Sequence, residues 1–196
     1  MEVLDAAFEI LVERGEPGMT MSAIAERAGA SKETLYAWFD RREGLISAMI
    51  AHQADATVGR VERALIDVDD PRATLTEFAE RLLRLLTDPR SLALNRAAMS
   101  NPTLADQLLT SGRHRVGPIV ERYLDRLGGD GVLEIDDAGN AFETFYGLAI
   151  RDSQIRALLG EAIDIDRIAA DRAHEAVSSF FALFGSTDRG DPIRSA

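Results

Sequence analysis

The sequence of 196 residues contains no cysteine, and Lys32 is the only lysine among its 22 basic side chains. Without cysteine the chain forms no disulfide and offers no thiolate for metal binding or catalysis. No run of 18 or more apolar residues occurs, so no membrane-spanning helix is predicted. The first residues are acidic and amphipathic, unlike the basic start and apolar stretch of a signal peptide. We therefore expect a cytoplasmic protein with no membrane partner.

Motifs of catalytic and metal sites are also scarce. The sequence contains no glycine-rich phosphate loop and no serine nucleophile elbow. Its three histidines, His52, His114 and His174, are far apart along the chain. The nearest approach to a metal pair is Asp171-x-x-His174, but the Glu-x-x-His motifs of di-iron helical bundles are missing. We expect no catalytic residue, no metal and no cofactor, and a helical metalloenzyme is the least favoured hypothesis.

The charge of the chain is acidic overall, with a formal net charge of −11 and a sequence pI near 4.7. This balance disfavours loose, non-specific binding to nucleic acid, which depends on neutralising phosphates. Within residues 27–42, however, four basic side chains face two acidic ones, so the local net charge is +2. The four are Arg27, Lys32, Arg41 and Arg42. A local basic patch on an acidic protein remains compatible with a specific polyanion partner.

Apolar residues recur at helical spacing along nearly the whole chain, and no strand-like alternation of useful length is present. Gly, Pro and Asx residues divide this pattern into about nine stretches. The predicted helices are one ending near Gly15, then 21–28, 32–38, 41–66, 71–87, 89–100, 103–127 with a possible break at Gly112, 137–159 and 164–184. The fold class is therefore all-α. We expect the polar tail, residues 186–196, to be flexible.

Residues 20–39 carry the strongest functional signal. Thr20 is a good N-cap for one short helix, Gly29 suits a tight left-handed turn, and Ser31 can cap the next helix. Two short helices joined by a glycine turn indicate a helix-turn-helix, whose second helix enters the DNA major groove in DNA-binding proteins. Leu35 would anchor this helix, SKETLYAWF, on Ile24 and Ala28.

The outward residues of this segment fit the chemistry of DNA. Lys32 can reach guanine O6 and N7, Thr34 a thymine methyl or a base edge, and Glu33 the cytosine amino group. Side chains suited to phosphate oxygens are Thr20, Ser31, Tyr36 and Arg42. Trp38 joins the candidate DNA surface, although with Phe39 it also fits an anchoring role. Helix-turn-helix pairs occur as well in proteins that never touch DNA, so spacing alone leaves DNA binding open.

The segments AAFEILVERG, TMSAIAERAGASKETLYAWF and REGL decide between these readings, because together they resemble the N-terminal domain of TetR/AcrR-type transcriptional regulators. The resemblance covers residues 4–50. It implies a homodimer, a DNA-binding domain and a helical C-terminal domain with a ligand pocket. In that family the residues matched by Tyr36, Arg42 and Thr20 contact phosphates.

The sequence departs from the family pattern in three places. The chain begins almost at its first helix, without the basic stretch that usually precedes it. At the start of the fourth helix, Arg41, Arg42, Glu43 and Gly44 replace the usual Ser, Lys and two Glu. We expect Asp40 to take over as the N-cap, with Glu43 completing a capping box, and Gly44 to cost about 0.5–1 kcal/mol relative to Ala. The usual Lys becomes Arg42, which keeps the charge.

The C-terminal region resembles the regulatory domains of AefR-like members through NRAAMSNPTL, RYLDRLGGDG and DDAGNAFETFYG. The family resemblance implies a four-helix dimer interface formed by the last two helices of each subunit. The candidate interface residues are Leu148, Ile155, Leu159, Ala169, Ala173, Ala176, Val177 and Phe180. The alternative is that these residues build a core within one chain.

A ligand pocket is implied by the same resemblance. Its candidate lining residues are Phe78, Leu82, Arg96, Met99, Tyr123, Phe142 and Tyr146. Each of them also fits a plain core position, and Arg96 fits a solvated or ion-paired side chain.

The sequence thus predicts a ligand-responsive transcriptional regulator, a repressor, that binds a near-palindromic double-stranded DNA operator as a homodimer and is released by a small-molecule effector. The alternative is a helical small-molecule-binding protein without DNA binding. The predicted domains are 1–45 for DNA binding, 46–185 for ligand binding and dimerisation, and 186–196 as the tail.

Overall fold

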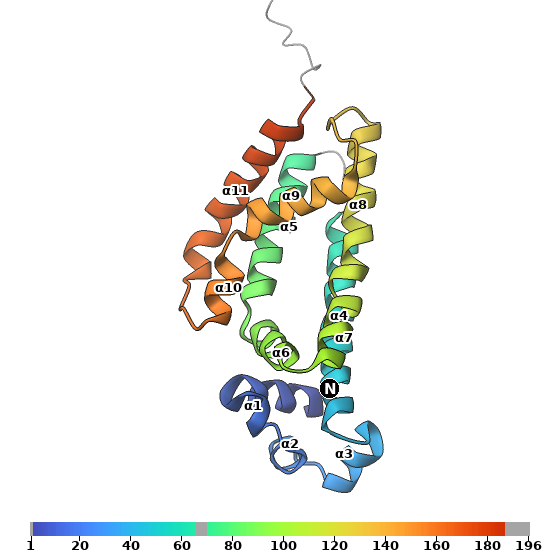
Figure 1. The fold of residues 1–196 in the computed structure, drawn as a ribbon, viewed down its shortest axis with the longest axis vertical. Helices are drawn as coiled ribbons and strands as arrows, with labels where there is room; N and C mark the ends of the chain where they lie inside the picture. Colours follow the sequence, from blue (N-terminus) through green and yellow to red (C-terminus); the bar gives the residue numbers. More distant parts are fainter. Residues whose placement is uncertain (1, 66–69, 187–196) are drawn as a thin grey trace, which may run out of the picture. The chain divides into compact units, whose positions relative to one another are not determined.

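The computed structural model describes residues 2–65 and 70–186, and the regular elements of these residues are all α-helices (Figure 1). They are α1 (Glu2–Gly18), α2 (Met21–Ala28), α3 (Lys32–Phe39), α4 (Arg42–Ala64), α5 (Pro71–Thr87), α6 (Pro89–Met99), α7 (Pro102–Ser111), α8 (Arg113–Gly129), α9 (Ala138–Ile150), α10 (Ser153–Leu158) and α11 (Ile165–Phe184). The predicted all-α fold is confirmed. The expectations for Ile66 and for the tail beyond Ser186 concern residues outside this description.

Two of the predicted helices are each divided in the structure. The stretch 103–127 becomes α7 and α8, with Gly112 as the break that the sequence indicated. The stretch 137–159 becomes α9 and α10, because Arg151 has a φ of 49°, which ends an α-helix. The nine predicted stretches therefore become eleven helices over the described residues.

The chain folds as two compact units that interleave along the sequence. Of the described residues, unit 1 comprises 2–60, 84–116 and 152–163, and unit 2 comprises 61–65, 70–83, 117–151 and 164–186. The predicted domain boundary at residue 45 lies inside α4, which begins at Arg42. That boundary stays a prediction.

The core of unit 1 fixes the first three helices in place. Phe8 of α1, Ile24 of α2 and Leu35 of α3 are all buried in one apolar cluster, together with residues of α4, α6 and α7. Burying each large apolar side chain contributes about 1.5–3 kcal/mol. Helix α1 keeps its apolar face inward as far as Leu11 and then kinks at Gly15, whose φ is 67°. The predicted end of the first helix near Gly15 corresponds to this kink.

The core of unit 2 is aromatic. Phe145 of α9 stacks on Phe78 of α5 with ring centroids 5.8 Å apart, and meets Phe180 of α11 edge-on at 5.3 Å. Such ring pairs add to the stabilisation from buried area. No helix in the described part of the chain is long and apolar enough to cross a membrane.

Candidate nucleic-acid interface

The local sequence sets the geometry of the α2–α3 pair. The Thr20 hydroxyl accepts a hydrogen bond from the Ala23 N–H at 3.1 Å and so caps α2. Gly29 ends α2 with a φ of 61°, a conformation that glycine adopts without steric cost. The Ser31 hydroxyl then accepts from the Thr34 N–H at 3.1 Å and caps α3. All three predicted roles are confirmed, and the pair forms a helix-turn-helix.

Helix α3 packs on the core through one buried residue, and most of its other side chains are exposed. Leu35 is fully buried, whereas Lys32, Glu33, Tyr36 and Trp38 are exposed. Trp38 is 64% exposed, so its expected role as an anchor is wrong. It lies one residue before the half-buried Phe39, on the outer side of α3. The exposed side of α3 therefore presents a cation, two aromatic rings and a carboxylate to any partner.

The hydroxyl groups at the start of α3 are already hydrogen-bonded to one another. Ser31 Oγ and Thr34 Oγ1 lie 3.0 Å apart, in addition to the capping bond from the Thr34 N–H. The Glu33 backbone N–H and the Ser31 hydroxyl both hydrogen-bond the Glu33 carboxylate and lower its pKa. Glu33 is thus favoured as an anion, the form that accepts a hydrogen bond from a base amino group.

Carboxylates of α1 hold two of the four basic side chains in residues 27–42. Arg27 Nη1 donates to Glu9 Oε2 at 2.9 Å, and its two terminal nitrogens grip Glu13 at 3.1 and 2.8 Å. Hydrogen bonding between Arg27 and Glu13 lowers the pKa of the Glu13 carboxyl and raises the pKa of the Arg27 guanidinium. Arg42 Nη2 lies 2.6 Å from Glu16 Oε1, and Arg42 Nη1 donates to the Glu16 carbonyl at 3.2 Å.

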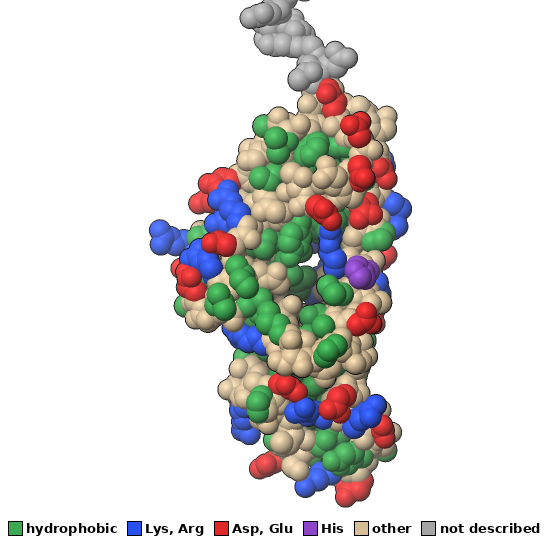
Figure 2. Space-filling view, viewed as in Figure 1, with side chains coloured by type: hydrophobic (Ala, Val, Ile, Leu, Met, Phe, Trp, Pro, Cys, Tyr) green, Lys and Arg blue, Asp and Glu red, His purple; other side chains and the backbone are tan. Residues whose placement is uncertain are grey.

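These pairs change the charge pattern that the local sequence indicated. Figure 2 shows acidic and basic side chains interspersed over the surface of the α1–α3 region. Within the described residues, Lys32 and Arg41 are the two basic side chains of this segment that enter no ion pair. The local sequence does not indicate these pairs, because Glu9, Glu13 and Glu16 are distant from their partners along the chain.

The turn between α3 and α4 is unusually tight. Asp40 has φ 62° and ψ −49°, and the Arg41 N–H donates to the Phe39 carbonyl at 2.6 Å. This is the γ-turn with positive φ, a rare and strained conformation. The Leu45 N–H donates to the Arg41 carbonyl, so Arg41 occupies the N-cap position of α4. The predicted capping box led by Asp40 is therefore wrong, because Asp40 instead ends α3.

Comparison with known proteins identifies this arrangement. Residues 3–49 match the bacterial regulatory proteins of the tetR family, and residues 73–186 match the C-terminal domain of AefR-like transcriptional repressors. The chain belongs to the TetR family of transcriptional regulators. The helix-turn-helix of α2 and α3 is the DNA-binding element of that family, and the expectation of a non-enzymatic regulator is confirmed.

Solved structures and curated relatives agree with this membership. A TetR regulator from Agrobacterium tumefaciens is 36% identical and has a TM-score of 0.75, with 94% of this chain and 93% of that chain covered. A regulator from Mycobacterium tuberculosis is 31% identical over 130 residues, which span 65% of this chain and 62% of that protein. The regulator FadR from Bacillus subtilis, in complex with stearoyl-CoA, shares the fold at 19% identity, with a TM-score of 0.75 and coverage of 91% and 97%.

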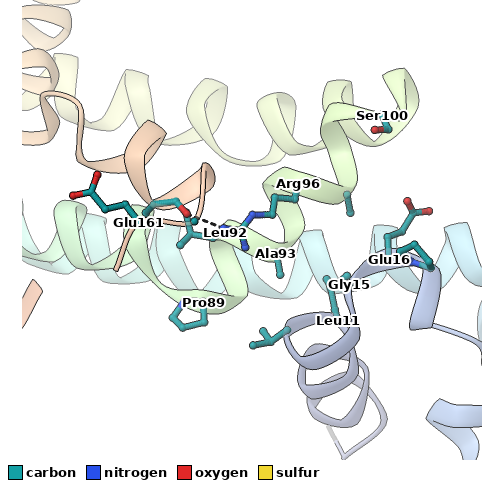
Figure 3. A pocket seen from close by; sticks show the side chains of 14 residues that line it. Leu11, Gly15, Glu16, Pro89, Leu92, Ala93, Arg96, Ser100 and Glu161 are labelled. Carbon is teal, nitrogen blue, oxygen red and sulfur yellow. Dashed lines mark hydrogen bonds between the residues drawn. The ribbon is translucent and has the colours of Figure 1, made fainter. Parts of the chain in front are cut away.

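A surface groove of about 670 Å³, which no sequence motif predicts, lies within unit 1 of this TetR-family chain. Its walls come from the end of α1, from α6 and from the segment after α10 (Figure 3). Leu11, Leu92 and Ala93 supply apolar surface, and Glu16 and Glu161 lie at its edges. Arg96 is the one predicted ligand-pocket residue that lines this groove.

Arg96 uses its guanidinium to hold the end of α10. Its Nε donates to the Leu158 carbonyl at 3.1 Å and its Nη2 to the Ala157 carbonyl at 2.7 Å. A cation at the last carbonyls of a helix is favoured by the helix dipole. The sequence led to two interpretations of Arg96, a ligand contact or a solvated or ion-paired side chain. Neither interpretation included this capping role.

The other predicted pocket residues are distributed between the two units. Phe78, Leu82, Tyr123 and Phe142 are buried in unit 2, and Tyr146 is half-buried there. Met99 belongs to unit 1 and is 64% exposed. Their assignment to a ligand pocket stays a prediction.

The predicted dimer residues fall into two groups by burial. Those of α11, namely Ala169, Ala173, Ala176, Val177 and Phe180, are buried within the chain. Their burial is what the intrachain-core alternative predicts, and their assignment to a dimer interface stays a prediction. Leu148 is half-buried, whereas Ile155 and Leu159 are 51% and 82% exposed.

Proposed function

We propose that this TetR-family chain is a repressor that binds a near-palindromic DNA operator as a homodimer and is released by a small-molecule effector. The observation that carries the proposal is the exposed face of α3. Lys32, Tyr36 and Trp38 project from a helix that Leu35 fixes on the core. This combination of a rigid base and exposed cationic and aromatic groups suits a helix that enters the major groove.

Each exposed residue has a distinct role in the proposed complex. Lys32 and Thr34 read base edges, and Glu33 accepts from a cytosine amino group. Thr20 and Tyr36 keep hydroxyl hydrogens that can be donated to phosphate oxygens, and Ser31 can do the same once its hydroxyl turns away from Glu33. Trp38 adds contact area beside the sugar–phosphate backbone of the DNA. Arg42 is the additional phosphate contact, once it leaves Glu16.

The homodimer is proposed to form through the outer faces of α9 and α11 in unit 2. Gly147 is exposed on α9, and a Cβ built there would meet no atom within 4 Å. On α11, Ala170, His174, Ser178 and Ala182 are exposed at four-residue spacing, with Leu183 beside them at 64% exposure. Small residues let helices approach closely. A dimer would place two α3 helices in successive major grooves, about 34–36 Å apart.

The effector is proposed to bind in the C-terminal domain, with Phe78, Leu82, Tyr123, Phe142 and Tyr146 as candidate contacts. Their apolar and aromatic character suits a hydrophobic ligand. The B. subtilis regulator that shares this fold was solved with stearoyl-CoA, so a long-chain acyl-CoA is the first probe to test. The ligand releases the operator only if it binds the DNA-free conformation more tightly.

Selection of bound fragments from the host genome tests the proposal. The expected result is enrichment of fragments that share a near-palindrome, with binding that weakens as salt rises. Lys32→Ala and Tyr36→Phe should reduce affinity for the selected fragment. Addition of an effector should release it. Absence of any enriched fragment would contradict the proposal.

One observation favours the alternative of a small-molecule-binding protein without DNA binding. Arg27 and Arg42 are neutralised by carboxylates of α1, which lowers the positive potential near α3. Under this alternative the purified protein would bind an effector but no genomic fragment at any salt concentration.

A further inference from the structure

The ion pair between Glu16 and Arg42 joins the end of α1 to the start of α4. Arg42 Nη2 lies 2.6 Å from the Glu16 carboxylate, and Arg42 Nη1 donates to the Glu16 backbone carbonyl at 3.2 Å. Glu43 Oε1 is a second carboxylate oxygen near the guanidinium, 3.9 Å from Arg42 Nη2. Both terminal nitrogens of the guanidinium are therefore directed to acceptors within the protein.

The pair is only partly shielded from water. The side chain of Arg42 is 35% exposed and that of Glu16 is 27% exposed. Partial exposure leaves the guanidinium accessible to a phosphate and keeps the ion pair weak enough to exchange partners. A guanidinium forms its strongest contacts with phosphate through two parallel N–H groups, and Glu16 now occupies these groups.

We propose that Glu16 sets the DNA affinity of this protein by competing with a DNA phosphate for Arg42. The proposal rests on the proposed function, because it requires DNA binding by α2 and α3. In the free protein the Glu16 carboxylate takes the position of a phosphate. In the complex Arg42 turns to the DNA backbone, and the cost of releasing Glu16 is subtracted from the affinity.

Carboxylates of α1 also pair with Arg27, which supports a general role of α1 in neutralising cations near the helix-turn-helix. Glu9 and Glu13 both bind Arg27, with its two terminal nitrogens between 2.8 and 3.1 Å from their oxygens. Three α1 carboxylates thus cover two of the four cations in residues 27–42. Only Lys32 and Arg41 remain outside ion pairs in the described part of this segment. Non-specific binding depends on the number of available cations, so this masking disfavours indiscriminate association with DNA.

Glu16→Gln tests the competition with a minimal change in shape. Glutamine keeps an oxygen that can accept from Arg42 but removes the charge that competes with phosphate. The matched control is Glu26→Gln on α2, which removes one charge from an exposed carboxylate of the same domain that forms no ion pair among the described residues. Relative to this control, Glu16→Gln should tighten binding by about 1.5- to 5-fold per protomer.

The measurement is fluorescence anisotropy with the genome-selected fragment and with a duplex of the same length and scrambled sequence. The gain should disappear when Glu16→Gln is combined with Arg42→Ala, since the competing cation is then gone. A purely structural clamp predicts the opposite, namely lower stability in chemical denaturation together with equal or weaker DNA binding. Equal binding by Glu16→Gln and Glu26→Gln overturns the inference while leaving the proposed function intact. If neither the wild type nor any variant binds a fragment, the proposed function and this inference both fail.

Discussion

A Cβ atom at position 44 would lie 2.1 Å from the backbone carbonyl oxygen of Phe39. Gly44 lies in the first turn of α4, and Phe39 is the last residue of α3. The backbones of the two helices therefore approach too closely for a side chain at position 44. The joint between the DNA-reading helix and α4 therefore depends on this one glycine.

Gly44→Ala should destabilise the protein, contrary to what helix propensity alone predicts. Propensity favours Ala by about 0.5–1 kcal/mol in a helix. The contact with a backbone atom cannot be relieved by rotating a side chain, so overpacking by about 1–3 kcal/mol should dominate. Chemical denaturation of the variant measures the difference. A gain in the free energy of unfolding would show that the turn relaxes without cost.

Asp40→Gly should act in the opposite direction at the same joint. Asp40 has a φ of 62° in a strained turn, and glycine adopts positive φ without the Cβ penalty. We expect the free energy of unfolding to rise by about 1 kcal/mol, because the relief of backbone strain exceeds the entropy that glycine adds to the unfolded chain. Asp40→Val should lower it, because a β-branched residue tolerates positive φ least. Comparing the two variants in the same denaturation assay isolates the backbone effect.

Trp38 should report DNA binding directly, since it is the only tryptophan of the chain and 64% of it is exposed. The emission of the free protein should resemble that of a hydrated indole. Saturation with the selected fragment should shift and quench it, and the scrambled duplex should have a smaller effect at the same salt concentration. Trp38→Phe provides the background signal. Unchanged emission at saturating DNA would remove Trp38 from the interface.

Ser178→Arg should dissociate the proposed dimer. Ser178 is exposed on α11, and an arginine there would be desolvated without a partner in a close helix interface. We expect the dimer dissociation constant to rise by about tenfold or more. The matched control is Leu109→Arg on α7, which replaces a residue that is 52% exposed outside the proposed interface. Sedimentation that shows equal masses for both variants would place the dimer interface elsewhere.

Arg96→Ala should loosen α10 without altering the effector response. Arg96 holds the Ala157 and Leu158 carbonyls, so its loss should increase amide hydrogen exchange in α10. Its side chain is committed to these bonds and is not proposed as an effector contact. A weaker effector response with unchanged exchange would restore the role of Arg96 in ligand binding.

Local chemistry made part of this structure predictable from the sequence. Thr20, Gly29 and Ser31 follow from capping and turn preferences that act over three or four residues. The all-α class follows from apolar spacing, and the burial of Leu35 follows from its position opposite Ile24 and Ala28 across the turn. The same local rules failed at Asp40, because aspartate suits both the N-cap that was predicted and the turn with positive φ that the structure has.

Non-local pairing accounts for the rest. Glu13 lies 14 residues from Arg27, and Glu16 lies 26 residues from Arg42, so the net charge of a short window could not show that these cations are paired. Apolar periodicity identified the inner face of α11 at Ala173 and Phe180. It could not distinguish a core within the chain from an interface between chains, because both bury the same kind of surface.

The most direct test of DNA recognition by α3 is operator binding by the wild type and by Lys32→Ala, with anisotropy measured across a range of salt concentrations on the genome-selected fragment. The wild type should bind tightly, with an affinity that falls steeply as salt rises, and Lys32→Ala should bind more weakly and discriminate less against the scrambled duplex. Equal affinity of the wild type and Lys32→Ala for both duplexes would contradict the assignment of α3 as the DNA-reading helix.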